Sequence, residues 1–488
     1  FFDGIERDMR RALDIGKPLE RTVPRLHALM ERMQQDRNGY VPTDDDHEMI
    51  DKEVRHATKV DVAAMWIAAK KVILLARVLN DPKLMKRLRA SPKARIMDVG
   101  HVTGDVLLDV VTPFGGRIVV GGPGRNEYDC TQIEIIVDLG GDDLYRGPAG
   151  GAGGLRRFAV CLDFEGDDTY ECLNDALGSA TYGIGVLIDV AGNDKYTASQ
   201  RSAGFGAAGV GVFVDAAGND EMKLGAHSGG VGLVGVGICV DLAGDDIQEA
   251  SDVSFGCGLP AGFGLFLDAK GDDKRSLSRD KSHAYMGMGA GRGLRGAIAG
   301  GVGVCLDLAG NDNHTGGDLC FGAGEDGGAG IFVDALGDDV YVAHDFSVGA
   351  ARQGSVAVFQ DWAGSDNYRT AANGLGFAVL GSRAFCFDLG GNDTYQVRGT
   401  GLGVVGGEAV AFFWDSKGKD SYLWDRGSND PVGGRLGLGL FLDTGDENDG
   451  YKRAGLEFFE GGMANGKTRW RGDKTDPQGA LHMFMDSK

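Results

Sequence analysis

The chain has 488 residues, of which 42% are hydrophobic and 83 are glycine, and its formal net charge is -21. The hydrophobic share excludes general disorder, and the acidic balance disfavours binding to nucleic acid or to anionic lipid. No stretch reads as membrane-spanning, because the most apolar candidate, residues 62–79, is interrupted by Lys70 and Lys71 and is predicted to be a core helix.

The first part of the chain differs in pattern from the rest. Residues 1–95 carry apolar residues at three- and four-residue spacing, notably within 7–13, 23–33 and 61–79, which predicts an α-helical domain. Residues 96–137 change to strand-like runs and end in a degenerate turn, and we interpret them as a transitional capping coil.

A turn motif, Asp-x-x-Gly-[Asp/Asn]-Asp-x-Tyr, then recurs twelve times within residues 138–455, at intervals of about 26 residues with one longer interval. A period this regular is typical of stacked units, each of which buries its apolar face against its neighbours. The first aspartates of the copies are Asp138, Asp163, Asp189, Asp215, Asp241, Asp268, Asp307, Asp334, Asp361, Asp388, Asp415 and Asp443.

The segment before each first aspartate alternates in the manner of a strand. GVGVFVD (209–215) and GLGLFLD (437–443) place branched residues on one face and small residues with Phe or Cys on the other. The glycine-punctuated stretch after each motif predicts a second and a third short strand. The sequence therefore predicts a mainly β protein, a parallel β-solenoid of about twelve coils, with residues 456–488 as a C-terminal cap or tail. A β-propeller is disfavoured, since its blades need about 40–45 residues.

The small-residue face forms a flat apolar stripe, and an apolar surface of this size is seldom left bare. We expect it to be covered by another strand layer of the same coil, by residues 1–95 or by another subunit. Its larger members are Cys161, Phe213, Cys239, Phe266, Cys305, Phe332, Phe359, Cys386 and Phe413.

The repeated aspartates pose an electrostatic problem, because stacking places them in columns of like charge about 4.8 Å apart. Calcium between successive turns would offset the repulsion, since this cation prefers oxygen ligands. Alternatively, each aspartate caps the amides of its own turn as an Asx-turn, and solvent screens the rest.

The turns GGNDTY (390–395), AGNDKY (191–196) and AGNDNH (309–314) resemble the glycine- and aspartate-rich nonapeptide of the RTX parallel β-rolls. The resemblance implies a roll with calcium between its turns and a secreted, periplasmic or cell-surface location. The eight cysteines are predicted to be free thiols, which leaves a cytoplasmic location open. The calcium ligands that the resemblance implies are the second aspartates: Asp143, Asp168, Asp194, Asp220, Asp246, Asp273, Asp312, Asp339, Asp366, Asp393 and Asp420.

The repeat departs from its own rule in four consecutive coils, where the motif tyrosine is replaced by Met222, Gln248, Arg275 and His314. The longer interval falls in the same region and produces a basic insertion near residues 274–300, and such insertions often lie on a binding side. The alternatives are drift of a tolerant surface loop and shielding of these coils by the helical domain. The residues of the binding hypothesis are Arg275, Arg279, His283, Tyr285, Arg292, Arg295 and His314.

No nucleophile elbow, zinc-protease helix or phosphate-binding loop stands out, so enzymatic activity is disfavoured. Three hypotheses remain, in this order: a non-enzymatic structural or interaction scaffold that docks into a larger assembly, an extracellular calcium-dependent module that binds carbohydrate or surfaces, and a β-helix polysaccharide lyase or hydrolase. A protein partner or a second copy of the chain is expected, and carbohydrate is a further candidate ligand.

Overall fold

The computed structural model is mainly β, a parallel β-solenoid of about 11 turns with few helices, which confirms the predicted fold class. It describes residues 52, 54–90, 95–112, 116–154, 156–278, 283–294, 300–424, 437–444, 449–453, 469–471 and 481–487, with isolated residues between 12 and 30. The chain forms two compact units. The first consists of residues 1–244, 261–263 and 296–298, and the second of residues 245–260, 264–295 and 299–488.

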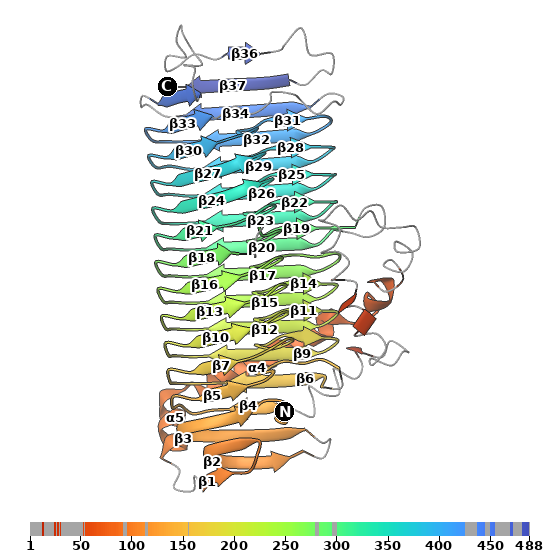
Figure 1. Cartoon of the computed structure of the whole chain (residues 1–488), viewed down its shortest axis with the longest axis vertical. Helices are drawn as coiled ribbons and strands as arrows, with labels where there is room; N and C mark the ends of the chain where they lie inside the picture. Colours follow the sequence, from red (N-terminus) through yellow and green to blue (C-terminus); the bar gives the residue numbers. More distant parts are fainter. Residues whose placement is uncertain are drawn as a thin grey trace. The chain divides into compact units, whose positions relative to one another are not determined.

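Most coils contain three strands, which we call A, B and C. The A strand ends at the first aspartate of the motif, the B strand carries the motif tyrosine or its replacement, and the C strand is a two-residue segment before the next A strand. Within each unit, equivalent strands of neighbouring coils pair in parallel (Figure 1).

In the first unit the A strands are β4 (Ile135–Val137), β6 (Phe158–Leu162), β9 (Ile184–Asp189), β12 (Val210–Asp215) and β15 (Val236–Asp241). Its B strands are β5 (Leu144–Arg146), β7 (Thr169–Glu171), β10 (Lys195–Ala198) and β13 (Glu221–Leu224), and its C strands are β8 (Ala180–Thr181), β11 (Gly206–Ala207) and β14 (Gly232–Leu233). The first coil is preceded by β1 (Arg95–Asp98), β2 (Val102–Val111) and β3 (Arg117–Asp129), of which β1–β2 and β2–β3 are antiparallel.

In the second unit the A strands are β17 (Phe263–Asp268, from Gly264 onward), β20 (Val302–Asp307), β23 (Ala329–Asp334), β26 (Val356–Asp361), β29 (Arg383–Asp388), β32 (Val410–Asp415), β34 (Leu438–Thr444) and β37 (Leu481–Ser487). The B strands are β16 (Ile247–Ala250), β18 (Lys274–Leu277), β21 (Asn313–Thr315), β24 (Val340–Asp345), β27 (Asn367–Ala372), β30 (Thr394–Val397), β33 (Ser421–Trp424) and β35 (Gly450–Arg453). The C strands are β19 (Gly291–Arg292), β22 (Gly324–Glu325), β25 (Ala351–Arg352), β28 (Ala378–Val379) and β31 (Val405–Gly406), and β36 (Arg469–Arg471) pairs antiparallel with β37.

The pairing register stacks identical motif positions on one another. Between β12 and β15, Val212 faces Ile238 and Asp215 faces Asp241. Along the A strands from β17 to β34 the small residue, the Phe or Cys and the aspartate are buried, while the residues between them, most of them branched or aromatic, remain partly exposed. The aspartate therefore shares the inner face with the flat apolar stripe.

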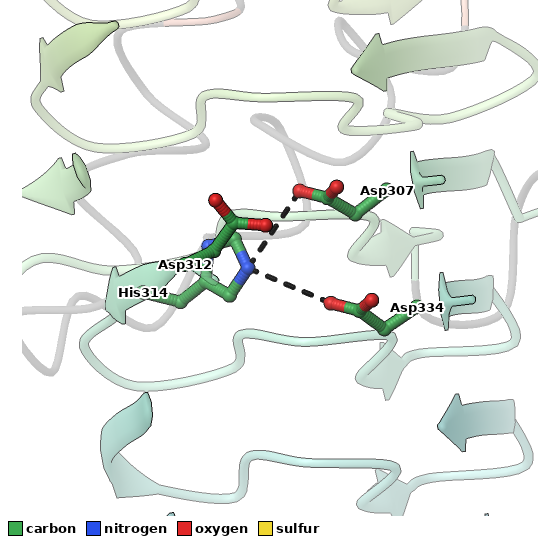
Figure 2. Close-up of side chains that lie close together, drawn as sticks. All are labelled: Asp307, Asp312, His314 and Asp334. Atoms are coloured by element: carbon green, nitrogen blue, oxygen red, sulfur yellow. Dashed lines mark ion pairs between the residues drawn. The ribbon is translucent and has the colours of Figure 1, made fainter. Parts of the chain in front are cut away.

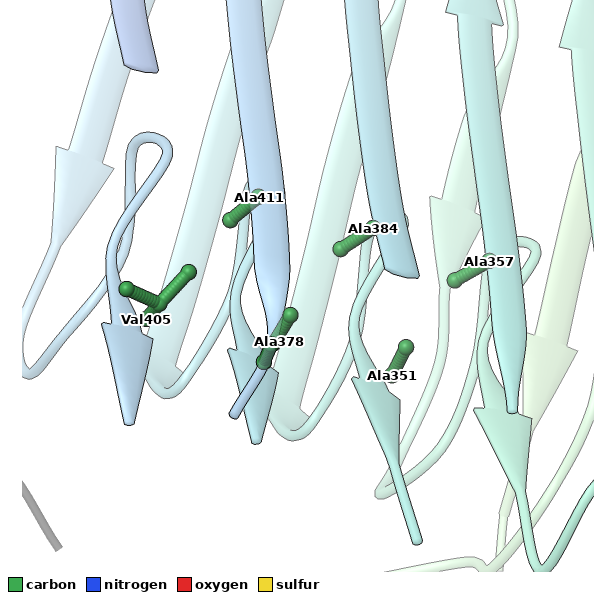
Figure 3. Close-up of a cluster of buried hydrophobic side chains, with 7 residues drawn as sticks. Ala351, Ala357, Ala378, Ala384, Val405 and Ala411 are labelled. Carbon is green, nitrogen blue, oxygen red and sulfur yellow. The ribbon is translucent and has the colours of Figure 1, made fainter. Parts of the chain in front are cut away.

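The C segment of the same coil covers the flat stripe. Of the three arrangements expected from the sequence, this is the one in which another strand layer of the coil provides the cover. All nine of its larger members are buried. A β-carbon added at Gly211 would lie 2.0 Å from the carbonyl oxygen of Phe205, so only glycine allows the two backbones to approach this closely. Farther along the second unit alanine takes this place, and the alanine side chains form a small core between the layers (Figure 3), which includes Ala351, Ala357, Ala378, Ala384 and Ala411.

The corners that carry the C segments adopt unusual backbone conformations. Leu177, Phe255 and Leu319 have φ angles of 52°, 59° and 52°, in the left-handed region that residues other than glycine seldom occupy. Amides of the C segments bond between coils, as from Gly204 to the Leu177 carbonyl oxygen. Regular stacking thus stabilises a conformation that costs about 1–2 kcal/mol per residue.

The helix α4 (Val62–Leu79) confirms the predicted core helix, and α5 (Pro82–Arg89) follows it. Asp61 caps α4 by accepting a hydrogen bond from the Ala64 amide. The buried face of α4, which includes Met65, Ala69 and Val72, packs against β9 and β12 within the first unit. The predicted helices at 7–13 and 23–33 lie largely outside the described residues.

Candidate functional site

The motif aspartates form two buried columns inside the coils. All first aspartates from Asp138 to Asp443 and all second aspartates from Asp143 to Asp420 are almost completely shielded from solvent. An ionised carboxylate is expensive to bury unless it is paired or accepts hydrogen bonds. The contacts of these side chains therefore decide what the columns do.

The second aspartates bond from coil to coil. Within each unit, the Oδ1 atom of a second aspartate accepts a hydrogen bond from the amide of the preceding second aspartate, as from Asp143 to Asp168 (2.6 Å), from Asp168 to Asp194 (2.6 Å) and from Asp366 to Asp393 (2.8 Å). The Oδ2 atoms of Asp143, Asp168, Asp366 and Asp393 are buried without a hydrogen-bond partner. One oxygen of each of these carboxyls thus caps a backbone amide, and the other faces the interior.

The first aspartates bond to the motif tyrosines. The Tyr170 hydroxyl lies 2.6 Å from Asp189 Oδ2, and the Tyr395 hydroxyl lies 2.6 Å from Asp388 Oδ2 and 2.8 Å from Asp415 Oδ2. The tyrosine rings stack with centroids 4.9–5.0 Å apart in the second unit. Some first aspartates also form the expected Asx-turns, as where Asp138 Oδ1 accepts the Gly140 amide at 2.7 Å.

Burial strongly favours the protonated form of these carboxyls. It raises the pKa of Asp143 to about 10, with Asp138 adding to the effect, and the pKa of Asp168 to about 9, with Asp189 adding to it. The pKa of Asp361 is raised for the same reason, and Asp388 contributes. In the absence of a cation, burial therefore favours the neutral carboxylic acid in both columns, and the first aspartates share hydrogen bonds with the tyrosine hydroxyls.

The donor atoms fit a hard cation in part. Carboxyl oxygens of Asp163, Asp168 and Asp189 lie within 4.8 Å of one another, and similar triads recur along the columns. Calcium prefers six to eight oxygen ligands, so such a triad supplies part of a calcium shell. The residues that would hold it are the second aspartates, as the resemblance implies, together with the first aspartates, which sequence reasoning did not include.

The four replacements of the motif tyrosine all point into the coils, since Met222, Gln248, Arg275 and His314 are buried. Arg275 donates to Asp268 (2.6 Å), Asp307 (3.1 Å) and the Gln248 side chain (2.8 Å). Burial opposes its charge, but Asp268 and then Asp307 raise the pKa of Arg275 further above its usual value. Arg275 thus replaces a tyrosine hydroxyl by a cation between two first aspartates.

His314 lies next to Arg275 in the stack, and its ring is surrounded by aspartates (Figure 2). Its Nε2 atom is 3.7 Å from Asp307 Oδ2 and 3.7 Å from Asp334 Oδ2. Burial, followed by the charge of Arg275, lowers the pKa of His314 to about 4, so the ring is neutral at pH 7.

The insertion is divided between two places in its coil. The sequence separation between equivalent positions of neighbouring coils shows where the extra residues lie. It is 27 residues between the coils of β16 and β18 and 39 residues between those of β18 and β21. In the C segments, Asp252 and Tyr285 are 33 residues apart, halfway between these values. About six extra residues therefore lie on each side of the C segment that ends in β19. Arg279 and Arg295 fall in these stretches and lie outside the described residues.

The other residues of the binding hypothesis are brought together in part. Glu325 is buried and pairs with Arg292 (3.3 Å) and with Arg352 (Nε at 2.7 Å), and it also accepts the Tyr285 hydroxyl. Burial works against ionisation of Glu325, but Arg292 and Arg352 outweigh it and lower its pKa. His283 lies elsewhere and stacks on His344 with a centroid separation of 3.6 Å. Binding of an external ligand by these residues stays a prediction.

Comparison with known proteins yields no matching family model, no matching curated protein and no matching solved structure. The resemblance to RTX rolls therefore rests on the repeated turn alone. Within the described ranges, no helix combines the length and apolar character that crossing a bilayer requires.

Proposed function

We propose that the protein is a non-enzymatic structural scaffold that docks into a larger assembly through the outer face of its A strands. The main support for this proposal is that the polar groups of the motif lie inside the coils, whereas the A strands present apolar side chains on the outside. The acids and tyrosines of the motif are buried and bonded to one another. A polysaccharide at the surface would not reach them, which counts against the lyase or hydrolase hypothesis.

The outer face of the second unit is mainly apolar along successive coils, with Gln360 and Arg383 as polar exceptions. The branched and aromatic residues that alternate with the buried positions of β20, β23, β26, β29, β32 and β34 are partly exposed. An apolar surface that continues from strand to strand is typical of an interaction site. Its central row consists of Val304, Ile331, Val358, Phe385, Phe412 and Leu440.

The first unit supports a helix as the docking element. There the equivalent face of β9 and β12 is buried, and α4 packs against both strands. The helix presents Met65, Ala68, Ala69 and Val72 to the sheet. We infer that a partner helix with a similar apolar face covers the exposed row of the second unit.

Calcium remains part of the proposal as a stabilising ion. It is supported by the buried second-aspartate oxygens that have no hydrogen-bond partner, such as Asp168 Oδ2 and Asp366 Oδ2, and by the preference of calcium for carboxylate oxygen. The secreted or cell-surface location that the resemblance implies stays a prediction.

The test compares the wild type with the double variant Phe385→Lys and Phe412→Lys in extracts of the source cells. We expect the wild type to elute from size exclusion well above its own 51.4 kDa and the variant to elute as the free chain. The control is Lys417→Glu and Lys419→Glu, two changes in a turn after β32, which should leave the complex intact. Elution of the wild type at its own mass would contradict the scaffold proposal.

A further inference from the structure

One group of side chains differs from every other rung of the aspartate columns because it contains an imidazole. Asp307 at the end of β20, Asp312 in the following turn, His314 in β21 and Asp334 at the end of β23 each offer one ligand atom, and these atoms lie within 4.8 Å of one another. All four residues are buried, and their side chains converge on one point (Figure 2).

A comparison with the next rung shows what is missing here. The Tyr341 hydroxyl lies 2.7 Å from Asp334 Oδ2 and 3.0 Å from Asp361 Oδ2, so it bonds to two successive first aspartates. His314 Nε2 occupies the equivalent place but is 3.7 Å from each of its two carboxyl oxygens. These separations are too long for hydrogen bonds, and Nε2 has no hydrogen-bond partner although His314 is only 1% exposed.

The neighbouring carboxyls also have oxygens that the chain leaves without a partner. Asp307 Oδ1, Asp312 Oδ2 and Asp334 Oδ1 are buried and have no hydrogen-bond partner. Leaving such polar atoms unsatisfied in the interior is unfavourable. The cluster therefore combines one nitrogen donor and three carboxylates whose bonding capacity the chain itself does not fill.

We propose that Asp307, Asp312, His314 and Asp334 bind a divalent transition-metal ion, with zinc as the representative ion. Zinc binds histidine nitrogen and carboxylate oxygen at about 2.0–2.2 Å in a tetrahedral arrangement, which places ligand atoms about 3.4 Å apart. The two separations of 3.7 Å from Nε2 are close to this value. Imidazole is a ligand for zinc and its neighbours in the first transition row, whereas calcium selects oxygen.

The charge balance of the cluster is compatible with a divalent ion. Arg275 pairs with Asp268 and Asp307 and offsets one of their two negative charges. With Asp312 and Asp334 also ionised, a divalent ion reduces the remaining charge of the group to one negative charge. The Arg275 Nη1 atom lies 3.5 Å from His314 Nδ1. A metal bound through Nε2 requires the neutral ring to carry its hydrogen on Nδ1, so binding of the ion moves the ring hydrogen to that atom and turns the guanidinium away from it.

This inference does not depend on the scaffold proposal or on calcium in the other rungs. The full chain is refolded from denaturant with zinc in the presence of excess calcium, and bound zinc is counted by elemental analysis after gel filtration. We expect one zinc per chain and a higher melting temperature than after refolding with a zinc chelator. With cobalt in place of zinc, the visible absorption of a four-coordinate N/O site is expected.

Two variants test the ligand assignment. His314→Tyr restores the ordinary rung, and His314→Gln copies the residue found at Gln248, so at least one should fold. Both should lose the bound zinc and the cobalt spectrum. His344→Asn removes a partly exposed histidine bonded to Asp318 and should keep both signals. Three results would overturn the proposal. The wild type could bind no zinc, a folded His314 variant could keep the zinc, or His344→Asn could be the one variant that loses it. In those cases His314 would serve only as a proton donor in its rung, or the metal would lie at the surface.

Discussion

At the scale of single residues, the interior of each coil depends on protons shared between carboxyl and phenol groups. The Tyr368 hydroxyl lies 2.8 Å from Asp361 Oδ2 and 2.9 Å from Asp388 Oδ2. A hydroxyl group has one hydrogen and donates it to one carboxyl only. The other carboxyl must then be protonated and donate to the tyrosine, which agrees with the raised pKa of both aspartates.

We predict that Tyr368→Phe lowers the free energy of unfolding by about 1–3 kcal/mol, the cost of leaving buried polar groups unsatisfied. The ring stack with Tyr341 and Tyr395 is retained, so the change isolates the hydroxyl. Urea denaturation followed by circular dichroism measures the effect. Equal midpoints for variant and wild type would mean that the two carboxyls do not need the bridge.

Arg275 offers a second test at this scale, because it is a cation inserted between Asp268 and Asp307. Arg275→Met removes the charge and leaves two buried carboxyls without their partner, a loss of about 3–5 kcal/mol at neutral pH. Arg275→Tyr restores the hydroxyl of the ordinary rung and should cost markedly less. Thermal melts of the two variants measured side by side give the comparison. A methionine variant more stable than the tyrosine variant would contradict the interpretation that Arg275 takes the place of a motif tyrosine.

At the scale of the elements, the A strands were predictable because their alternation has a period of two. The same alternation places the first aspartate on the inner face with the Gly, Phe and Cys positions, so its burial follows from parity along the strand. The C strands are only two residues long, and their corners place Leu177 and Phe255 at positive φ. Stacking imposes that conformation, and no local signal of residue type marks it.

The candidate site was less predictable than the strands. Tyr285 and Arg292 were singled out as basic-loop residues, but their partner Glu325 lies in the next C segment. That contact depends on how the two halves of the insertion are distributed around β19, which residue spacing alone does not determine. The replacement of tyrosine at Arg275 and His314, in contrast, was readable as a break in the repeat.

The close approach of A and C layers gives a prediction for Gly211→Ala. The new methyl group would meet the Phe205 carbonyl oxygen at 2.0 Å, so the layers must separate. Overpacking of this kind costs about 1–3 kcal/mol. The matched control is Ala384→Gly, at the equivalent place in a coil already spaced for a methyl group, and it should cost no more than about 1 kcal/mol. Equal losses of stability in urea would show that the layer spacing does not differ along the chain.

At the scale of the whole molecule, the formal net charge of -21 counts every aspartate as ionised. The buried columns contribute many of those charges on paper, yet burial raises the pKa of these carboxyls well above that of a free aspartate. The folded chain therefore carries less negative charge than its composition indicates, unless cations neutralise the columns. Proton uptake and cation binding are alternative ways to stabilise the same fold.

These alternatives predict opposite dependences on pH. The pKa of Asp168, Asp366 and Asp393 is raised by burial to about 9, 8 and 10, against about 3.9 in an unfolded chain. The folded state thus holds more protons than the unfolded state between these values, and its extra stability is complete below pH 4 and lost as pH rises through 8 to 10. In excess chelator at fixed ionic strength, we expect the melting temperature to fall by about 5 °C or more between pH 6 and pH 9.5.

Adding calcium at pH 9.5 should restore the melting temperature if the columns bind the ion, because ligand binding stabilises the folded state. The double variant Asp366→Asn and Asp393→Asn should show a shallower fall, and a melting temperature that rises with pH in chelator would mean that the interior carboxyls are ionised.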